Sequence, residues 1–184
     1  MEALRQTPGV TGAAFANQLP APGCGGGGTS IYVEGRPQDA LGQRVCFILA
    51  TPEFFATVRI PLRAGRLLSE SDQNADPLAV VINEAAARAY WPGRNPIGAS
   101  ARLSTPDGDR LDVVGVVGDV RNSGRNKPAA PEIYLPAAVL GVNPMNVVVR
   151  SDLPADRVIA EARRAIQQTD PTLVMEDEIG RAHV

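Results

Sequence analysis

Residues 80–103, with the sequence VVINEAAARAYWPGRNPIGASARL, constrain the fold more than any other stretch of the chain. An apolar, strand-like run leads directly into an alanine-rich helical run. Asn83 stands at the junction, where a short polar side chain can cap the first turn of a helix. Pro92 and Gly93 end that helix, because proline cannot continue it and glycine accommodates the turn that follows. The stretch therefore predicts a strand, a helix and a second strand joined by tight corners.

The next stretch predicts a β-hairpin. Residues 99–120 contain two strand-like runs on either side of Pro106, Asp107 and Gly108. These residue types favour a tight turn, and we expect Gly108 to serve it by adopting a positive φ at no steric cost. The two runs are expected to form the arms of the hairpin.

The remaining elements complete an α+β pattern. Strands are predicted where β-branched and aromatic residues gather, and helices where capping residues precede a helical run. The predicted strands are 9–16, 30–35, 44–50, 78–82, 132–136, 145–150 and 172–176. The predicted helices are a short run near residues 2–6, residues 51–58 capped by Thr51, residues 84–91, and a long run that ends at Asp170. Residues 60–77 are expected to be mostly connection.

The long helix near the carboxyl end is expected to have one apolar face. Val158, Ala162 and Ile166 recur at four-residue spacing, with Ile159 beside them. The adjacent Arg163 and Arg164 are expected to face outward, near the end of the helix where the dipole favours cations. The pattern thus predicts an amphipathic helix.

The composition argues against several classes of partner. The chain has 184 residues, enough for one domain or for two small interlocked ones. Lys and Arg number 18 and Asp and Glu number 20, so the net charge of −2 offers no excess positive field for nucleic acid or an anionic bilayer. The cluster of Arg121, Arg125 and Lys127 is interpreted as a solvated loop. No run approaches the roughly 18 apolar residues of a membrane-spanning helix, and no signal-peptide pattern begins the chain.

Two motifs that suggest a ligand fail on their context. Gly23, Gly25 and Gly28 have the spacing of a phosphate-binding loop, but Thr29 stands where a lysine is needed and a strand-like run follows instead of a helix. The segment is interpreted as a flexible loop. Asp72, Asn74 and Asp76 have the spacing that opens a calcium loop, but Pro77 replaces its glycine and Asn83 its closing glutamate. No calcium site is therefore predicted.

Catalytic constellations are also missing. His183 is the only histidine and lies one residue from the end of the printed sequence, so an interior histidine-based metal site or nucleophile pair is excluded. Asp107, Asp109 and Asp112 could form a carboxylate pair, but Asp107 is interpreted as a turn residue and the others as polar positions on the hairpin. The prediction is a chain with no catalytic, cofactor-binding or metal-binding residue, and with binding residues that the sequence leaves unknown.

Trp91 and the two cysteines have structural interpretations. Trp91 follows Tyr90 at the end of a helix and is expected to fill a core that is poor in aromatic residues, rather than to serve as a stacking platform. Cys24 and Cys46 lie 22 positions apart, a spacing that fits no metal pair. A disulfide remains open in an oxidising compartment, and unpaired cysteines are the favoured interpretation.

Several distinctive stretches follow one another along the chain. They are Gly65-Arg66 followed by Asp72, the helix start Asn83-Glu84, Trp91-Pro92-Gly93, Asn95-Pro96-Ile97-Gly98, and the strand-like run at 113–121. In this order they resemble the MacB-like periplasmic core domain of bacterial ABC transporter permeases, especially the large orphan permeases that carry two such domains. The resemblance extends from Pro8 to the region of Asp177.

The resemblance implies an architecture in two parts. A porter-like α+β subdomain of βαβ units would comprise residues 1–60 and 131–184, and a smaller, mainly β subdomain would be inserted at 61–130. Such domains lie on the periplasmic face of the bacterial cytoplasmic membrane, between two transmembrane helices. The short helix near residues 2–6 would then be the end of a stalk, and the chain would be part of a longer protein.

The resemblance also implies a non-catalytic role. The outer domains of these dimeric permeases move when the ATPase domains or subunits cycle, so the expected function is to couple ATP-driven motion to a cargo or a partner protein. The expected partners are the transmembrane helices and ATPase of the parent permease and a periplasmic protein, without a cofactor. The isolated domain is expected to be a monomer.

Two alternative functions remain. The first is a stand-alone periplasmic module that binds a ligand or peptide in a groove between the two subdomains. The second is a hydrolase using Asp109 or Asp112, which would require these carboxylates to converge in a pocket. The cargo, the partner, the dimer contacts and the position of this domain within its parent are not determined by the sequence.

Overall fold

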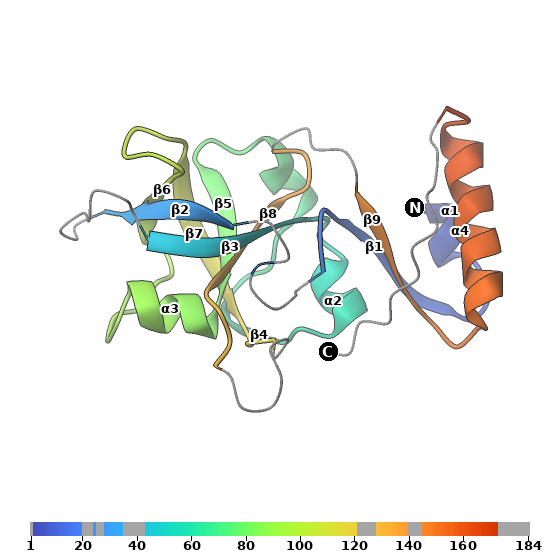
Figure 1. Ribbon diagram of the computed structural model, residues 1–184, viewed down its shortest axis with the longest axis horizontal. Coiled ribbons are helices and arrows are strands. Elements are labelled where there is room, and N and C mark those ends of the chain that lie inside the picture. Colours follow the sequence, from blue (N-terminus) through green and yellow to red (C-terminus); the bar gives the residue numbers. More distant parts are fainter. Residues whose placement is uncertain are drawn as a thin grey trace.

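The structure, a computed structural model, describes residues 2–19, 24, 28–34, 43–120, 128–139 and 145–172. The molecule is elongated, with a group of strands and helix α3 (Glu84–Tyr90) at one end and helices α1 (Glu2–Arg5) and α4 (Ala155–Thr169) at the other (Figure 1). This mixture of helices and strands confirms the predicted α+β class. None of the described helices combines the length and the apolar character that a bilayer crossing requires.

Six strands of the described chain close into a barrel. They are β2 (Gly28–Val33), β3 (Gln43–Ala50), β5 (Leu78–Asn83), β6 (Ser100–Leu103), β7 (Arg110–Val117) and β8 (Glu132–Pro136). Strand β2 pairs with β6 on one side and with β3 on the other, and β7, β5 and β8 complete the circle. The β3–β8 and β5–β7 pairs are parallel, whereas the other neighbours in the ring are antiparallel.

Alternate side chains of the barrel strands enter two different cores. On β8, Ile133 and Leu135 face the interior of the barrel, whereas Tyr134 between them faces a second core outside it. Strand β5 does the same, with Val80 and Ile82 inside and Val81 outside. Because successive side chains of a strand point to opposite faces, strands buried on both sides are apolar at nearly every position. This double burial explains the continuous apolar runs in the sequence.

Helix α3 closes one mouth of the barrel. Asn83 caps it as predicted, with its Oδ1 atom accepting the backbone N–H of Ala86 at 2.8 Å. Tyr90 and Trp91 are 5% and 8% exposed and pack into the barrel core, with their ring centroids 6.1 Å apart in an edge-to-face arrangement. The prediction that Trp91 fills the core is confirmed.

Strands β6 and β7 form the predicted hairpin, with Ala101 opposite Leu111. The expected reason for Gly108 is wrong, because Gly108 is not among the residues with positive φ. Its role is to leave space, since a Cβ atom at this position would overlap the carbonyl oxygen of Leu103. The left-handed residue at this turn is Ser104, with φ of 64°.

The other end of the molecule, here called the arm, consists of α1, β1 (Val10–Ala16), β9 (Asn146–Ser151) and α4. Strands β1 and β9 pair antiparallel along their whole length and lie side by side in Figure 1. A small core of its own holds the arm together, formed by Leu4, Ala13, Ala162 and Ala165. The arm is thus a two-stranded ribbon with two helices packed at its far end.

The predicted apolar face of α4 is only partly right. Ala162 is buried, but Val158, Ile159 and Ile166 are half-buried, and Ala165 takes their place in the core. The contact of α4 with α1 and β9 thus centres on two small side chains. The two arginines that follow Ala162 are exposed, as expected.

Two segments near the middle of the chain differ from the predictions. Helix α2 (Phe54–Val58) begins three residues after Thr51, whose hydroxyl does not cap the helix but accepts the backbone N–H of Phe15. Residues 60–77, expected to be mostly connection, contain strand β4 (Leu62–Gly65) and the 3-10 helix η2 (Glu70–Asn74). Strand β4 pairs with β7, outside the ring.

Cys24 and Cys46 form a disulfide, so the preference for unpaired cysteines was wrong. The linear spacing of the two cysteines conceals their proximity. Strand β2 places Gly28 opposite Cys46 on β3, only four positions after Cys24 in the chain. Such a bond fits an oxidising compartment outside the cytoplasm.

The division into residues 1–60 with 131–184 and residues 61–130 stays a prediction. The barrel takes β2, β3 and β8 from the first set and β5, β6 and β7 from the second. Of the strand predicted at 172–176, only Thr172 lies within the described residues.

Two glycines with the same backbone conformation provide a test of close packing. Gly65 and Gly93 both have φ of 70°, but a Cβ atom at Gly65 would overlap the carbonyl oxygen of Val114, whereas nothing lies within 4 Å at Gly93. Gly93→Ala should cost only the left-handed conformation, about 1 kcal/mol. Gly65→Ala should cost about 3 kcal/mol, because overpacking adds to that strain. Urea unfolding of both variants measures the difference, and equal losses would contradict the packing described here.

Candidate functional site

The arm meets the barrel where the last residues of β1 reach the last residues of β3. Ala16 lies opposite Ala50 in the antiparallel register. Thr51 contributes two bonds, because its backbone N–H donates to the Phe15 carbonyl at 3.0 Å and its hydroxyl accepts the Phe15 N–H at 3.1 Å. This region, here called the joint, is a hydrogen-bonded connection between the arm and the barrel.

Asn17 extends the joint beyond the end of β1. Its backbone N–H donates to the Leu49 carbonyl at 3.0 Å, and its side-chain Oδ1 accepts the Leu49 N–H at 2.8 Å. Asn146, the first residue of β9, donates its Nδ2 to the Asn17 carbonyl at 2.8 Å. Gln18 then donates its Nε2 to the Phe47 carbonyl at 2.6 Å. Amide side chains therefore hold β1, β3 and β9 together where the strand ladder ends.

Helix α2 supports the joint through aromatic packing. Phe54 and Phe55 are both fully buried, and their rings lie 6.2 Å and 5.1 Å from that of Tyr134 on β8. This cluster belongs to the second core, which also contains Ala14 and Ala16 of β1. The helix thus packs against both the arm and the barrel.

Polar contacts fix α2 to the arm. The Arg150 Nε atom on β9 donates to the Thr57 carbonyl at 2.6 Å, and Arg5 on α1 pairs with Glu53 at 2.8 Å. Gly12 on β1 faces the same turn of α2, and a Cβ there would lie 3.1 Å from the Thr57 hydroxyl oxygen. The close approach leaves little room for the ribbon to shift across the helix.

A buried polar network connects the second core to the plugged mouth of the barrel. The hydroxyl of Tyr134 donates to Glu132 Oε2 at 2.7 Å, and the backbone N–H of Glu132 donates to Asn83 Oδ1 at 3.0 Å. Asn83 also donates its Nδ2 to the Ala130 carbonyl at 2.8 Å. Burial raises the pKa of Glu132 to about 6, although the Tyr134 hydroxyl opposes the shift. Burial likewise raises the pKa of Tyr134 well above its ordinary value.

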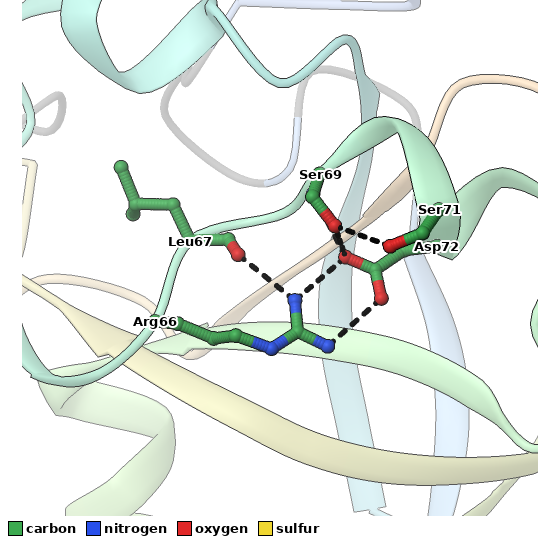
Figure 2. A network of polar contacts seen from close by, with 5 residues as sticks. All are labelled: Arg66, Leu67, Ser69, Ser71 and Asp72. Carbon is green, nitrogen blue, oxygen red and sulfur yellow. Dashed lines mark hydrogen bonds and ion pairs between the residues drawn. The ribbon is translucent and has the colours of Figure 1, made fainter.

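Arg66 and Asp72 form a bidentate ion pair at the corner between β4 and η2 (Figure 2). The guanidinium donates to the two carboxylate oxygens at 2.7 Å and 2.9 Å. Ser69 adds two bonds to the same carboxylate, from its backbone N–H and its hydroxyl, both at 2.8 Å. The hydrogen bond from Arg66 is the main cause that lowers the pKa of Asp72 to about 2. This carboxylate closes a corner, and its oxygens are engaged by Arg66 and Ser69 rather than directed toward a metal site.

The other residues singled out in the sequence do not converge either. Asp107 and Asp109 are exposed, and Asp112 is half-buried and accepts the Ser100 hydroxyl at 2.7 Å. Gly28 begins strand β2, so no helix follows the glycine run. Gly23, Gly25, Arg121, Arg125, Lys127 and His183 lie outside the described residues. Within the described ranges, no group of metal-binding side chains comes together.

The mouth of the barrel opposite α3 holds a cavity of about 310 Å³. Phe47, Leu103 and Leu135 supply its apolar lining, and Thr29, Ser104, Thr105, Gly108 and Asp109 its more polar part.

Sequence reasoning found neither this mouth nor the joint. The available signal was limited to polar residues at strand ends, such as Asn17 and Thr51, whose partners lie more than 30 positions away.

Glu132 provides a pH test of the buried network. Its folded-state pKa of about 6 lies above the ordinary glutamate value of 4.5, so its contribution to stability is fully present below pH 4.5 and is lost as the pH rises through 6. The shift corresponds to about 2 kcal/mol between pH 4.5 and 7.5. Glu132→Gln should abolish this part of the pH dependence, because glutamine does not ionise. Urea unfolding across that range measures it, and an unchanged slope in the variant would contradict the assignment.

Comparison with known proteins places this architecture in a family. The family model of the MacB-like periplasmic core domain matches residues 2–168. A search of curated protein sequences found no match.

Solved structures share the fold. The periplasmic region of MacB from Actinobacillus actinomycetemcomitans has a TM-score of 0.58 at 15% identity, with 91% of this chain and 71% of that one covered. The extracellular domain of the ABC-type transporter YknZ from Gram-positive bacteria has a TM-score of 0.59 at 18% identity, with 94% and 82% covered. The chain therefore belongs to the family of MacB-like periplasmic core domains of ABC-transporter-type permeases.

Proposed function

We propose that this domain is non-catalytic and couples the ATP-driven motion of its parent permease to a cargo or a periplasmic partner protein. Family membership supplies the setting, since the family is a periplasmic domain of ABC-transporter-type permeases with transmembrane and ATPase parts. The observation that carries the proposal is the joint. It connects the arm, where α1 lies, to the barrel through a continuous set of strand pairs and side-chain bonds.

The path from α1 to the barrel supports transmission of motion. Leu4 of α1 is 2% exposed and packs with Ala13 of β1 in the core of the arm. Strand β1 then runs to the joint while paired with β9 throughout. Paired strands resist displacement, because any shift of one strand past the other breaks several hydrogen bonds together. A movement applied at α1 would therefore reach the barrel with little loss.

The chemistry of the titratable groups supports the non-catalytic part of the proposal. Among the described residues, the carboxyl groups with strongly shifted pKa values are Asp72, which is paired with Arg66, and Glu132, which is buried and accepts the Tyr134 hydroxyl. Neither group lines the cavity at the barrel mouth. Perturbed groups indicate an active site when they face a cleft, and here they serve corners and cores.

Asn17→Ala tests the coupling, with Asn95→Ala as its matched control. Each asparagine accepts one backbone N–H with Oδ1, from Leu49 at 2.8 Å and from Ile97 at 3.1 Å, but only Asn17 lies at the joint. In the parent permease, spin labels on the two barrels of the dimer report their distance with and without nucleotide. Asn17→Ala should reduce the nucleotide-dependent change in distance while ATP hydrolysis continues, and Asn95→Ala should leave both unchanged. If the distance between the two barrels is the same with and without nucleotide in the unmodified permease, the proposal is refuted.

A second candidate function is a stand-alone periplasmic module that binds a ligand or peptide. The cavity at the open barrel mouth favours it. Its lining comes from both predicted subdomains, with Phe47 and Leu135 in one and Leu103 in the other. The two functions are compatible if the partner to which motion is coupled is itself held at the cavity.

We also propose that the chain is monomeric in isolation. Among the residues that the structure describes, Leu62 is the single large hydrophobic residue that is exposed, with 42% of its surface accessible. Stable dimers of identical chains usually bury a more apolar face than such a surface offers. Light scattering should therefore give the mass of one chain at micromolar concentration, and a dimer mass that persists on dilution would overturn the proposal.

A further inference from the structure

We propose that the open barrel mouth binds an apolar side chain of a partner protein that has a lysine or arginine beside it. The inference rests on the proposal that the domain engages a periplasmic partner, and it assigns the site and the chemistry of that contact. Its starting point is the difference between the two mouths of the barrel. One is plugged by Tyr90 and Trp91, whereas the other contains the cavity of about 310 Å³.

The floor of the cavity fits an apolar group. Leu135 and Leu103 are 0% and 7% exposed, and both belong to the barrel core, while Phe47 beside them is only half-buried. A cavity of this size is at the lower end of the range for small-ligand sites, which begins near 300 Å³. An inserted side chain would cover the part of Phe47 that the barrel leaves accessible, and burying apolar area favours binding.

The rim of the cavity has a fixed shape. The hydroxyl groups of Thr29 and Ser104 lie 3.1 Å apart in a hydrogen bond between β2 and the hairpin turn. The Ser104 backbone is held in the left-handed region at φ of 64°, and its N–H donates to the Ser30 carbonyl at 2.8 Å. A serine in that region carries a conformational cost that the surrounding bonds offset. The rim is therefore formed before any ligand arrives.

The charge at the rim selects a cation. Asp109 lines the cavity and is exposed. The nearby arginines are engaged elsewhere in the described structure, with Arg110 paired to Asp112 at 3.2 Å and Arg102 bonded to the Gly108 carbonyl at 3.3 Å. The carboxylate of Asp109 is thus available to a lysine or arginine next to the inserted side chain. Charge complementarity at an interface of this kind chiefly provides specificity.

Two dipeptides test the inference on the chain itself. Acetyl-Phe-Lys-amide and acetyl-Phe-Glu-amide share the apolar group and differ in charge. In a ¹H–¹⁵N NMR titration at low salt, the lysine peptide should bind saturably and at least fivefold more tightly than the glutamate peptide. The amide signals of Thr29, Ser104 and Leu135 should shift, whereas that of Trp91 at the opposite mouth should not. Salt should reduce the preference, because exposed charges are screened.

Asp109→Asn has a matched control in Asp107→Asn. Both aspartates are exposed on the same turn, but only Asp109 lines the cavity. Asp109→Asn should remove the preference for the lysine peptide, and Asp107→Asn should retain it. Thr105→Trp, at an exposed position on the rim, should fill the mouth and weaken both peptides.

Several results would overturn the inference. They are the absence of saturable binding of the lysine peptide, equal affinity for the two peptides, or equal effects of the Asp107 and Asp109 substitutions. Tighter binding of hexylamine than of the lysine peptide would assign the cavity to a free amphiphilic amine instead of a protein side chain. These outcomes leave the coupling proposal intact, because the barrel-distance measurement on the parent permease tests it separately.

Discussion

Closure of the barrel through β2 is the constraint on which the rest of the structure depends. This strand satisfies the edges of two others, because it pairs with β3 near its beginning and with β6 near its end. Without it, both edges would present unpaired backbone groups and the apolar interior would open to water. The disulfide from Cys24 to Cys46 anchors the chain four residues before β2 begins. The plugged mouth, the cavity and the joint all take their positions from this ring.

Local patterns in the sequence predicted most of the individual elements but not their closure. The Asn83 cap and the hairpin depend on residues close in the chain, and the burial of Trp91 was expected from its large apolar ring; all three predictions are confirmed. The pairing of Ile31 with Leu103 joins residues 72 positions apart, and no local pattern encodes it. The disulfide was missed for the same reason. The joint was missed because the bond from Leu49 to Asn17 is a tertiary contact. A polar residue after a strand does not by itself identify the residue with which it bonds.

The buried polar groups of the barrel wall are shared between elements rather than assigned to one. Asn83 caps α3, accepts the N–H of Glu132 on β8 and donates to the Ala130 carbonyl. Glu132 in turn accepts the Tyr134 hydroxyl, whose ring lies against α2. A buried amide or carboxyl group must keep its partners to avoid a large desolvation cost. The network therefore ties the position of the plugging helix to that of the aromatic cluster at the joint.

The alternation of side chains along β1 gives the arm a discrete register. Ala14 and Ala16 belong to the second core, together with residues of α2, whereas Ala13 belongs to the core of the arm, together with residues of α4. A slip of one residue would exchange the two faces of the strand and turn Phe15 into a space occupied by alanine. The ribbon has no stable intermediate position between these registers. Strands β1 and β9 therefore do not slip past each other, and the ribbon is rigid along its length. Under the proposed coupling, motion of the arm would then appear as rotation or translation of the whole domain, rather than as a gradual rearrangement inside it.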